Sequence, residues 1–206
     1  MTCTPIVYIV AENSPHRAMV ERLLSEEGMA WRSFSTGQAF LAGYDPDSAG
    51  CLILDYSLPG MDGLEVQQIL ASRGRPVPII MVTDSANVTI ATKAMRSGAV
   101  DVLEQPSDPA VLLQRVREAL GEQANRRERL ARRRMASRQL EVLSPREHQV
   151  MRLLVAGKNT KQIALQLNLS VKTVHIHRAR VLEKTGCDSV VGLIKLAAEA
   201  GEVNVP

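Results

Sequence analysis

Four oxygen-bearing side chains stand at the ends of short apolar segments in the first half of the chain. They are Glu12 after residues 5–10, Asp55 at the end of 51–55, Thr83 at the end of 79–83 and Gln105 just after 100–103. Carboxylate, hydroxyl and amide oxygens suit a divalent cation such as Mg²⁺ together with a phosphoryl group. The four side chains could do this chemistry only if the segments that carry them end at one edge of a sheet.

The segments between these side chains have the pattern that such a sheet requires. Segments expected to form strands alternate with helical patterns, and they cover residues 5–10, 31–35, 51–55, 79–83 and 100–103. Four of them are apolar runs, whereas apolar and polar residues alternate in 31–35. Strands that are apolar on both faces are typical of a parallel sheet covered by helices. We therefore expect a doubly wound, five-stranded, flavodoxin-like α/β domain over residues 1–120. In such sheets the functional cleft lies outside the carboxyl ends of the strands, at the switch point in strand order.

Charge divides the chain into two halves. Residues 1–106 contain 7 Lys and Arg against 12 Asp and Glu, whereas residues 107–206 contain 18 against 10. The basic second half favours nucleic acid as its partner. All six aromatic residues lie before residue 57, so the second half has no stacking platform for single strands, and duplex DNA is the better fit.

The second half contains start signals for four short helices. Ser144, Asn159, Ser170 and Asp188 are the candidate N-caps, and the first two are followed three residues later by Glu147 and Gln162. Residues 166–170 leave only a short turn between two helices, which is helix-turn-helix spacing. We expect a small all-α, four-helix domain over residues 143–206, joined to the first domain by a helical linker over 121–142.

The helix after that turn has two different faces at about 100° per residue. Val174 and Val181 point inward, and Arg178 lies near the edge of the outward face. The outward face combines cations with short or apolar side chains, a mixture that suits phosphates and base edges in a major groove. Its residues are Lys172, His175, Ile176, Ala179 and Arg180.

The stretch from Leu143 to Gly186 resembles the LuxR-type helix-turn-helix of the FixJ/NarL response regulators. The resemblance rests on LSPRE, on the run that begins at Gly157, and on residues 172–178. It implies base contacts from His175, Ile176 and Ala179. It also implies phosphate contacts near Lys161, Thr173, His177, Arg178 and Lys184. The last helix, 189–200, is apolar around much of its circumference, so we expect a homodimer on DNA through Val190, Val191 and Ile194.

Residues 4–120 resemble the receiver domain of two-component response regulators. The resemblance rests on residues 51–63, 78–83 and 94–101. It implies that Asp55 accepts a phosphoryl group from a histidine kinase and that the Thr83 hydroxyl turns toward it. Three positions of the receiver pocket depart from the family pattern. Ala11 and Glu12 replace a pair of acids, Gln105 replaces a lysine, and Val102 replaces the switch aromatic.

These departures predict a DNA-binding transcriptional regulator whose receiver is poorly phosphorylated or independent of phosphorylation. Mg²⁺ would be held weakly, by Glu12 and Asp55. The alternative is a conventional phospho-switch activated at Asp55 by a histidine kinase. Two other classes stay open: an acylphosphatase-like or flavodoxin-like enzyme, although no nucleophile–base pair is evident, and a partner-binding module without DNA. Three cysteines without paired spacing and the lack of a leader or a long apolar run favour a cytoplasmic, non-membrane protein.

Overall fold

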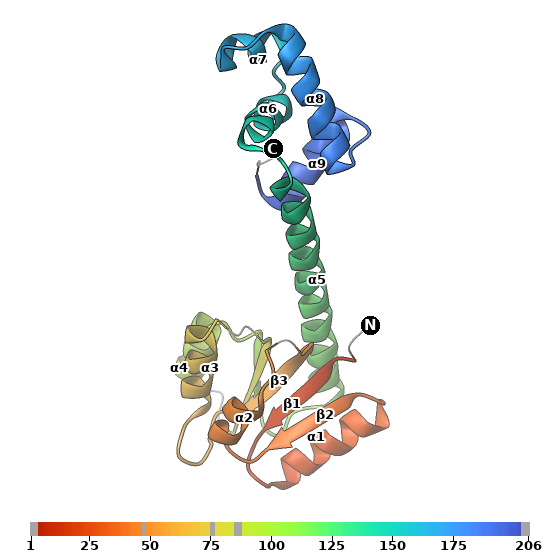
Figure 1. The fold of residues 1–206 in the computed structure, drawn as a ribbon. Helices are drawn as coiled ribbons and strands as arrows, with labels where there is room; N and C mark the ends of the chain where they lie inside the picture. Colours follow the sequence, from red (N-terminus) through yellow and green to blue (C-terminus); the bar gives the residue numbers. More distant parts are fainter. Residues whose placement is uncertain (1–3, 47, 75–76, 85–87, 203–206) are drawn as a thin grey trace. The chain divides into compact units, whose positions relative to one another are not determined.

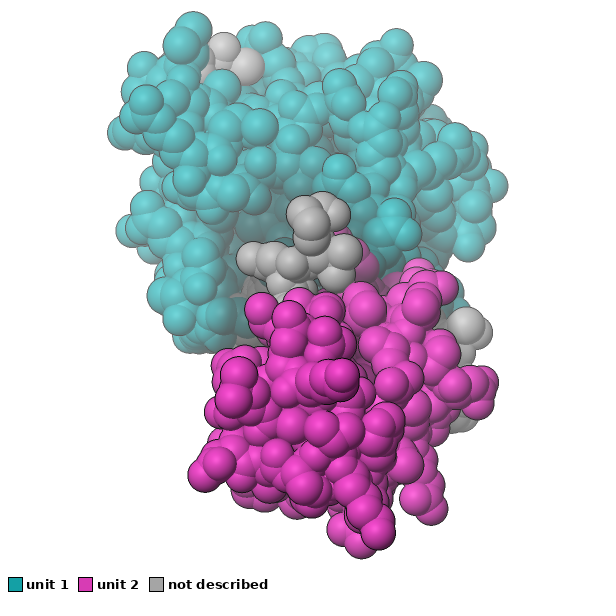
Figure 2. All heavy atoms as spheres, turned by 90° about the horizontal axis from the view of Figure 1, so that it is seen from above, with its two compact units in different colours: residues 1–126 teal, residues 127–206 magenta. Residues whose placement is uncertain are grey.

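A computed structural model describes residues 4–46, 48–74, 77–84 and 88–202. The chain forms two compact units, residues 1–126 and 127–206, which are coloured separately in Figure 2. Each unit is described by itself below. Within the described residues, no helix is both long enough and apolar enough to cross a membrane.

The first unit is built on a five-stranded parallel sheet (Figure 1). Its strands are β1 (Ile6–Val10), β2 (Ala30–Phe34), β3 (Gly50–Asp55), β4 (Ile79–Thr83) and β5 (Asp101–Glu104). They lie in the order β2-β1-β3-β4-β5, and every neighbouring pair is parallel. The predicted doubly wound sheet is confirmed, with the switch in strand order between β1 and β3.

Alternate residues of the strands pack against two layers of helices. The helices are α1 (Pro15–Glu26), α2 (Gly37–Gly43), α3 (Gly63–Ser72), α4 (Val88–Arg96) and the first part of α5 (Pro109–Glu141). Tyr8 and Val10 of β1 enter a core that contains side chains of α2, α3 and α4. Val7 and Ile9 enter a second core, with side chains of α1 and α5. The expected start of α4 at Asn87 lies outside the described residues.

Aromatic side chains form one cluster inside the first unit. The rings of Tyr8, Phe34, Phe40 and Tyr44 contact one another, with the centroids of Phe40 and Tyr44 5.2 Å apart. The Tyr8 hydroxyl lies 2.6 Å from Ser48 Oγ, so this buried polar group is satisfied. Trp31, on β2, donates from its indole N–H to Ser25 Oγ at 2.9 Å.

Helix α5 is longer than the sequence predicts. The expected helix ended at Leu120 and a helical linker followed over 121–142, whereas one unbroken helix continues through Gly121 to Glu141. Gln123 is buried, and its amide oxygen accepts a hydrogen bond from the Gly50 N–H at the start of β3. The first unit therefore extends to Arg126. The cause is the scarcity of helix-breaking residues in this segment, where a single glycine is tolerated.

The second unit contains the end of α5 and four short helices, as expected. These are α6 (Pro145–Val155), α7 (Thr160–Leu167), α8 (Val171–Thr185) and α9 (Val190–Ala200). Ser144 and Asn159 form the predicted capping boxes, and Ser170 caps α8. The last cap is Ser189 rather than Asp188, since the Ser189 hydroxyl accepts the Gly192 N–H at 3.1 Å. Cys51 and Cys187 are free thiols, and Cys3 lies outside the described residues.

Candidate phosphoacceptor cleft and nucleic-acid interface

Three acidic residues lie at the carboxyl ends of β1, β3 and β4. Asp55 ends β3, Glu12 follows β1 and Asp84 follows β4. Behind Asp55 the chain turns back sharply, and the Gly63 N–H donates to the Tyr56 carbonyl at 2.9 Å. A side chain at Gly63 could not fit, because its Cβ would lie 2.6 Å from the Asp55 carbonyl oxygen. The loop therefore holds Asp55 at the mouth of the cleft.

Asp55 is electrostatically disfavoured as a carboxylate. Burial, followed by the charge of Asp84, raises its pKa from 3.8 to about 6, with a smaller contribution from Glu12. Hydrogen bonds from the backbone at Ser57 and Tyr56 act in the opposite direction but do not cancel these effects. An acceptor that shares its surroundings with two other acids needs a cation to become an effective nucleophile.

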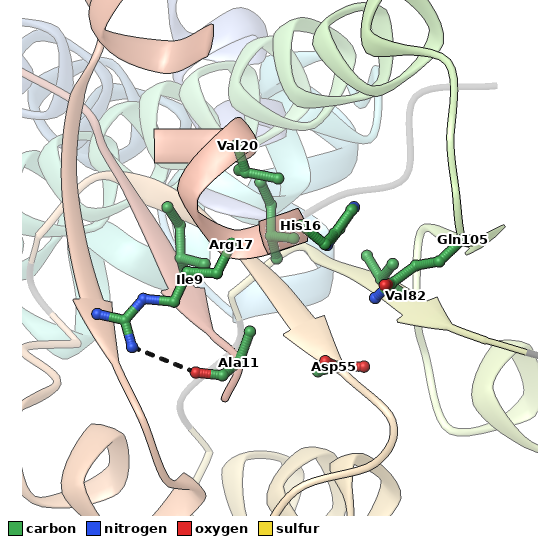
Figure 3. Close-up of a pocket in the computed structure, with 9 residues that line it drawn as sticks. Ile9, Ala11, His16, Arg17, Val20, Asp55, Val82 and Gln105 are labelled. Atoms are coloured by element: carbon green, nitrogen blue, oxygen red, sulfur yellow. Dashed lines mark hydrogen bonds between the residues drawn. The ribbon is translucent and has the colours of Figure 1, made fainter. Parts of the chain in front are cut away.

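A small cavity lies beside Asp55 where Ala11 and Gln105 are found. Its volume is about 10 Å³, near the minimum for one water molecule, and its lining also includes His16 and Val82. In Figure 3 the Gln105 side chain extends from the end of β5 toward Val82. The structure thus brings Asp55, Ala11 and Gln105 together, as the sequence predicts.

His16 is a pocket residue that the sequence analysis did not identify. Its Nε2 is buried, and none of the described residues offers it a hydrogen bond. Burial lowers the pKa of this imidazole, and the charge of Asp84 only partly opposes the effect. His16 lines the cavity next to Arg17 and Asp55. A useful signal in the sequence was its position in the first turn of the helix that follows Glu12.

The neighbouring cation, Arg17, is already engaged. Its guanidinium pairs with Glu21 at 2.7 Å and donates to Ser33 Oγ at 2.8 Å. It also donates to the Ala11 carbonyl at 3.4 Å, on the side of the cleft away from Gln105 (Figure 3). Arg17 therefore braces the end of β1 and is not directed at Asp55.

The two remaining receiver positions, Thr83 and Val102, lie on β4 and β5. Thr83 ends β4 with 3% of its surface exposed. Val102 is a half-buried aliphatic residue on β5 that packs against the core beneath α4. A valine has no ring that could swing between an outward and an inward position.

Receiver domains generally use Mg²⁺ for phosphorylation, and the cleft offers a limited donor set for it. Ala11 contributes no carboxylate, and within the described part of the chain no three His, Cys, Asp or Glu side chains gather closely enough to hold a metal. Mg²⁺ accepts one or two carboxylates and completes its shell with water. A weakly held Mg²⁺ on Glu12 and Asp55 stays a prediction.

The second unit presents α8 as an exposed helix. Val174 and Val181 are fully buried in the domain core, as predicted. Thr173, His177 and Arg178 are half-buried at the edges of the helix. The solvent-facing side has the predicted mixture of charge and small apolar groups, and Ile176 keeps 46% of its surface exposed. The exposed residues are Lys172, His175, Ile176, Ala179 and Arg180.

The turn between α7 and α8 fixes the start of α8. Asn168 adopts a left-handed conformation, φ +53°, which an asparagine tolerates better than most residues. The Ser170 hydroxyl accepts the Thr173 N–H at 3.0 Å. Arg146 of α6 donates to the Leu167 carbonyl at 2.5 Å, which ties α6 to the end of α7. Lys161 is exposed in the first turn of α7.

Lys184 is engaged within the domain. Its ammonium donates to the buried carboxylate of Glu147 at 2.7 Å, and Glu147 also accepts the Ser144 N–H at 2.8 Å. The hydrogen bond from Lys184 lowers the pKa of Glu147 to about 2. This pair locks α8 to the start of α6. A phosphate contact from Lys184 stays a prediction.

Helix α9 uses most of its apolar residues inside its own domain. Leu193, Leu196, Ala197 and Ala200 are buried in the core. The residues expected to form a dimer lie on another side. Val191 is 63% exposed, and Val190 and Ile194 are half-buried.

A parallel sheet with an aspartate at its carboxyl edge, followed by a helix-turn-helix, defines a signal-receiving regulator of transcription. Family models agree with both units: the response regulator receiver domain matches residues 7–117, and the bacterial regulatory proteins of the luxR family match residues 141–197. The chain belongs to the response regulators that carry a LuxR-type DNA-binding domain.

Similar proteins extend over the whole chain. The transcriptional regulatory protein FixJ of Bradyrhizobium diazoefficiens is 34% identical over 209 residues, which cover 99% of this chain and 100% of that one. The response regulator protein TmoT of Ectopseudomonas mendocina is 33% identical over 93% of this chain and 87% of its own length. Among solved structures, the response regulator StyR has 30% identity and a TM-score of 0.84, with 95% of this chain and 99% of that chain covered.

Proposed function

We propose that this transcriptional regulator binds duplex DNA through α8 and that its DNA binding does not require phosphorylation of Asp55. The observation that carries the second part is the cavity beside Asp55, which Ala11, Gln105 and His16 line. None of these three groups is a permanent charge, and the guanidinium of Arg17, which also lines the cavity, is already paired with Glu21. A phosphoryl group on Asp55 would lack the cation that usually pairs with it, and an amide dipole is a weaker partner than an ammonium.

Two further features support phosphorylation independence. The raised pKa of Asp55 disfavours the ionised carboxylate that attacks the phosphodonor. Ala11 adds no carboxylate to the candidate Mg²⁺ site, where the family has an acid. Each lost charge-assisted contact is worth roughly 1.5–3 kcal/mol where it is desolvated, so two of them reduce a rate or an equilibrium about a hundredfold or more. Val102 supplies no aromatic side chain to relay a modification.

The direct test is labelling by acetyl phosphate in the presence of Mg²⁺, with Asp55→Asn as the control. We expect slow or absent labelling and the same DNA affinity before and after treatment. Stoichiometric labelling of Asp55 within minutes, with a tenfold or larger gain in DNA affinity, would show that the protein is a conventional phospho-switch controlled by a histidine kinase.

The DNA interface is proposed from the exposure and charge of α8 and the start of α7. Lys161 and Arg178 are assigned to phosphates, and Ile176 to base edges. Replacing either cation with alanine should weaken binding to every duplex and reduce the salt slope by about 0.9 per lost contact. Ile176→Ala should change the preference among sequences instead. Unchanged affinity and salt slope in both Lys161→Ala and Arg178→Ala would refute the placement of the interface.

The homodimer on DNA is proposed through α9. Val191 is the large apolar side chain that α9 leaves most exposed, and it has no use in the core of its own domain. A two-fold dimer would cover it and would match an inverted-repeat site. If some regulation does act on this protein, we expect it through contact with a partner protein, through protein level or through another ligand.

A further inference from the structure

The second half of α5 carries a dense positive charge within the same compact unit as the helix-turn-helix. Residues 127–138 contain six arginines and one acid, Glu128, and every one of these arginines is exposed. Residues 127–206 form one compact unit, and Ala136 and Leu140 of α5 are buried in the core that α6–α9 share. This charged segment is therefore held by the DNA-binding domain through packing and is more than a connector.

Helical periodicity places three of these arginines on one outer face. At about 100° per residue, Arg127, Arg134 and Arg138 lie within about 40° of one another. They are roughly 160° away from the buried side formed by Ala136 and Leu140. Three turns of helix separate the first from the last, a span of about 16 Å. We call Arg127, Arg134 and Arg138 the α5 basic face.

One other arginine of the segment is engaged within its own helix. Arg132 pairs with Glu128 at 2.6 Å. The guanidinium of Arg133 lies against Gly201, where an added Cβ would be 3.0 Å from it. By contrast, Arg134 and Arg138 form no ion pair with the described residues, and both line a hollow of about 360 Å³ along α5.

We propose that the α5 basic face binds the phosphates of duplex DNA beyond the segment that α8 contacts. This inference rests on the proposed function, since it needs the helix-turn-helix to hold the duplex nearby. Guanidinium groups suit phosphate oxygens because they offer paired donors. The helix is already folded, so binding orders only side chains. Each contact adds affinity without reading sequence.

Two other occupants fit the face less well. A second copy of α5 would set arginine against arginine, and Glu128 is already paired. A membrane surface would need a continuous apolar stripe, whereas the exposed Leu130 and Met135 lie about 140° apart around the helix. Charge therefore favours a polyanion over a protein copy or a lipid surface.

The test uses the full chain with Arg134→Gln and Arg138→Gln together. The matched control replaces Arg22 and Arg73, which are exposed in the first unit, with glutamine and so changes the net charge equally. Affinity is measured by fluorescence anisotropy at several salt concentrations, on a duplex of about 15 base pairs and on one of about 40. We expect a three- to tenfold loss for the Arg134/Arg138 variant on the long duplex only, with a salt slope smaller by up to about 2.

The remaining outcomes separate the competing explanations. Lysine at both positions should restore binding, which distinguishes lost charge from a folding defect. Equal affinity of the glutamine pair and the wild type on the long duplex, while Lys161→Ala weakens binding to both duplexes, would overturn this inference and leave the proposed function intact. Loss of self-association or of binding to anionic phosphatidylglycerol vesicles, with DNA affinity unchanged, would assign the face to those partners and also overturn it.

Discussion

Replacing Asp55 with asparagine should stabilise the first unit at neutral pH. Asp55 has a pKa of about 6 in the folded protein against 3.8 ordinarily, because burial and Asp84 oppose its charge. A carboxyl group whose folded pKa is raised destabilises the fold when it is ionised, so the cost is fully present above pH 6. The cost fades as the pH falls through 6 and is gone below about 3.8. Asparagine removes the charge and keeps an oxygen that can accept a backbone hydrogen bond.

The expected gain follows from the size of the shift. About two pKa units at 1.36 kcal/mol each set an upper limit near 3 kcal/mol. Asp55 is only half-buried, and solvent screening reduces the expected gain to about 1–2 kcal/mol at pH 7.5. At pH 3.5, below the ordinary pKa of 3.8, the variant and the wild type should differ by only about 0.2 kcal/mol. Mg²⁺ should stabilise the wild type and leave the variant unchanged.

Native-state hydrogen exchange of peptides from β1 and β3 measures the free energy of unfolding of this unit. Intrinsic exchange rates are corrected at each pH, and Glu26→Gln serves as the control because Glu26 is an exposed acid on α1, far from the cleft. Destabilisation by Asp55→Asn at pH 7.5 would refute the conclusion that the ionised Asp55 carboxylate destabilises the fold. A gain of the same size at pH 3.5 would refute the electrostatic origin of the stabilisation.

Three further predictions concern the ion pair, the cleft and the dimer. Lys184→Met should destabilise the second unit by roughly 2–3 kcal/mol in denaturant unfolding at pH 7, because it leaves the buried Glu147 carboxylate without its cation. Since the pKa of Glu147 is lowered to about 2, wild-type stability should hold above pH 4.5 and fall as the pH drops toward 2, a decline that Glu147→Gln should lack. Restoring the family groups with Ala11→Asp and Gln105→Lys should speed acetyl phosphate labelling at least tenfold, and an unchanged rate would refute the role assigned to these positions. Val191→Glu should weaken binding to an operator with two half-sites much more than to one half-site, and equal losses would argue against dimerisation through α9.

The sheet was predictable from sequence because four of its five strands are apolar runs, each followed by or ending on a polar residue near the cleft. Parallel strands place those ends at one edge, so Asp55, Ala11 and Gln105 could be assigned to one cleft before their coordinates were known. Capping residues fixed the starts of α6, α7 and α8 in the same way, since a cap acts over only three residues.

Features that depend on distant contacts were not predictable. The sequence places His16 in the first turn of α1, but its contact with the Asp55 cavity results from how α1 packs on the sheet. The pairing of Lys184 with Glu147 joins residues 37 positions apart. The end of the first unit at Arg126 depends on Gln123 reaching the start of β3. Each of these requires the fold itself.

Because every aromatic ring lies in the first unit, that unit has a spectroscopic signal of its own. Trp31 and the tyrosines supply the fluorescence and the absorbance near 280 nm, so both signals report the sheet domain alone. Circular dichroism at 222 nm contains helices of both units. Heating the intact chain while recording the two wavelengths would therefore separate two melting curves without a label. Suppose that a DNA ligand raises the melting temperature recorded at 222 nm but leaves the one recorded by fluorescence unchanged. That result would show that the two units melt independently.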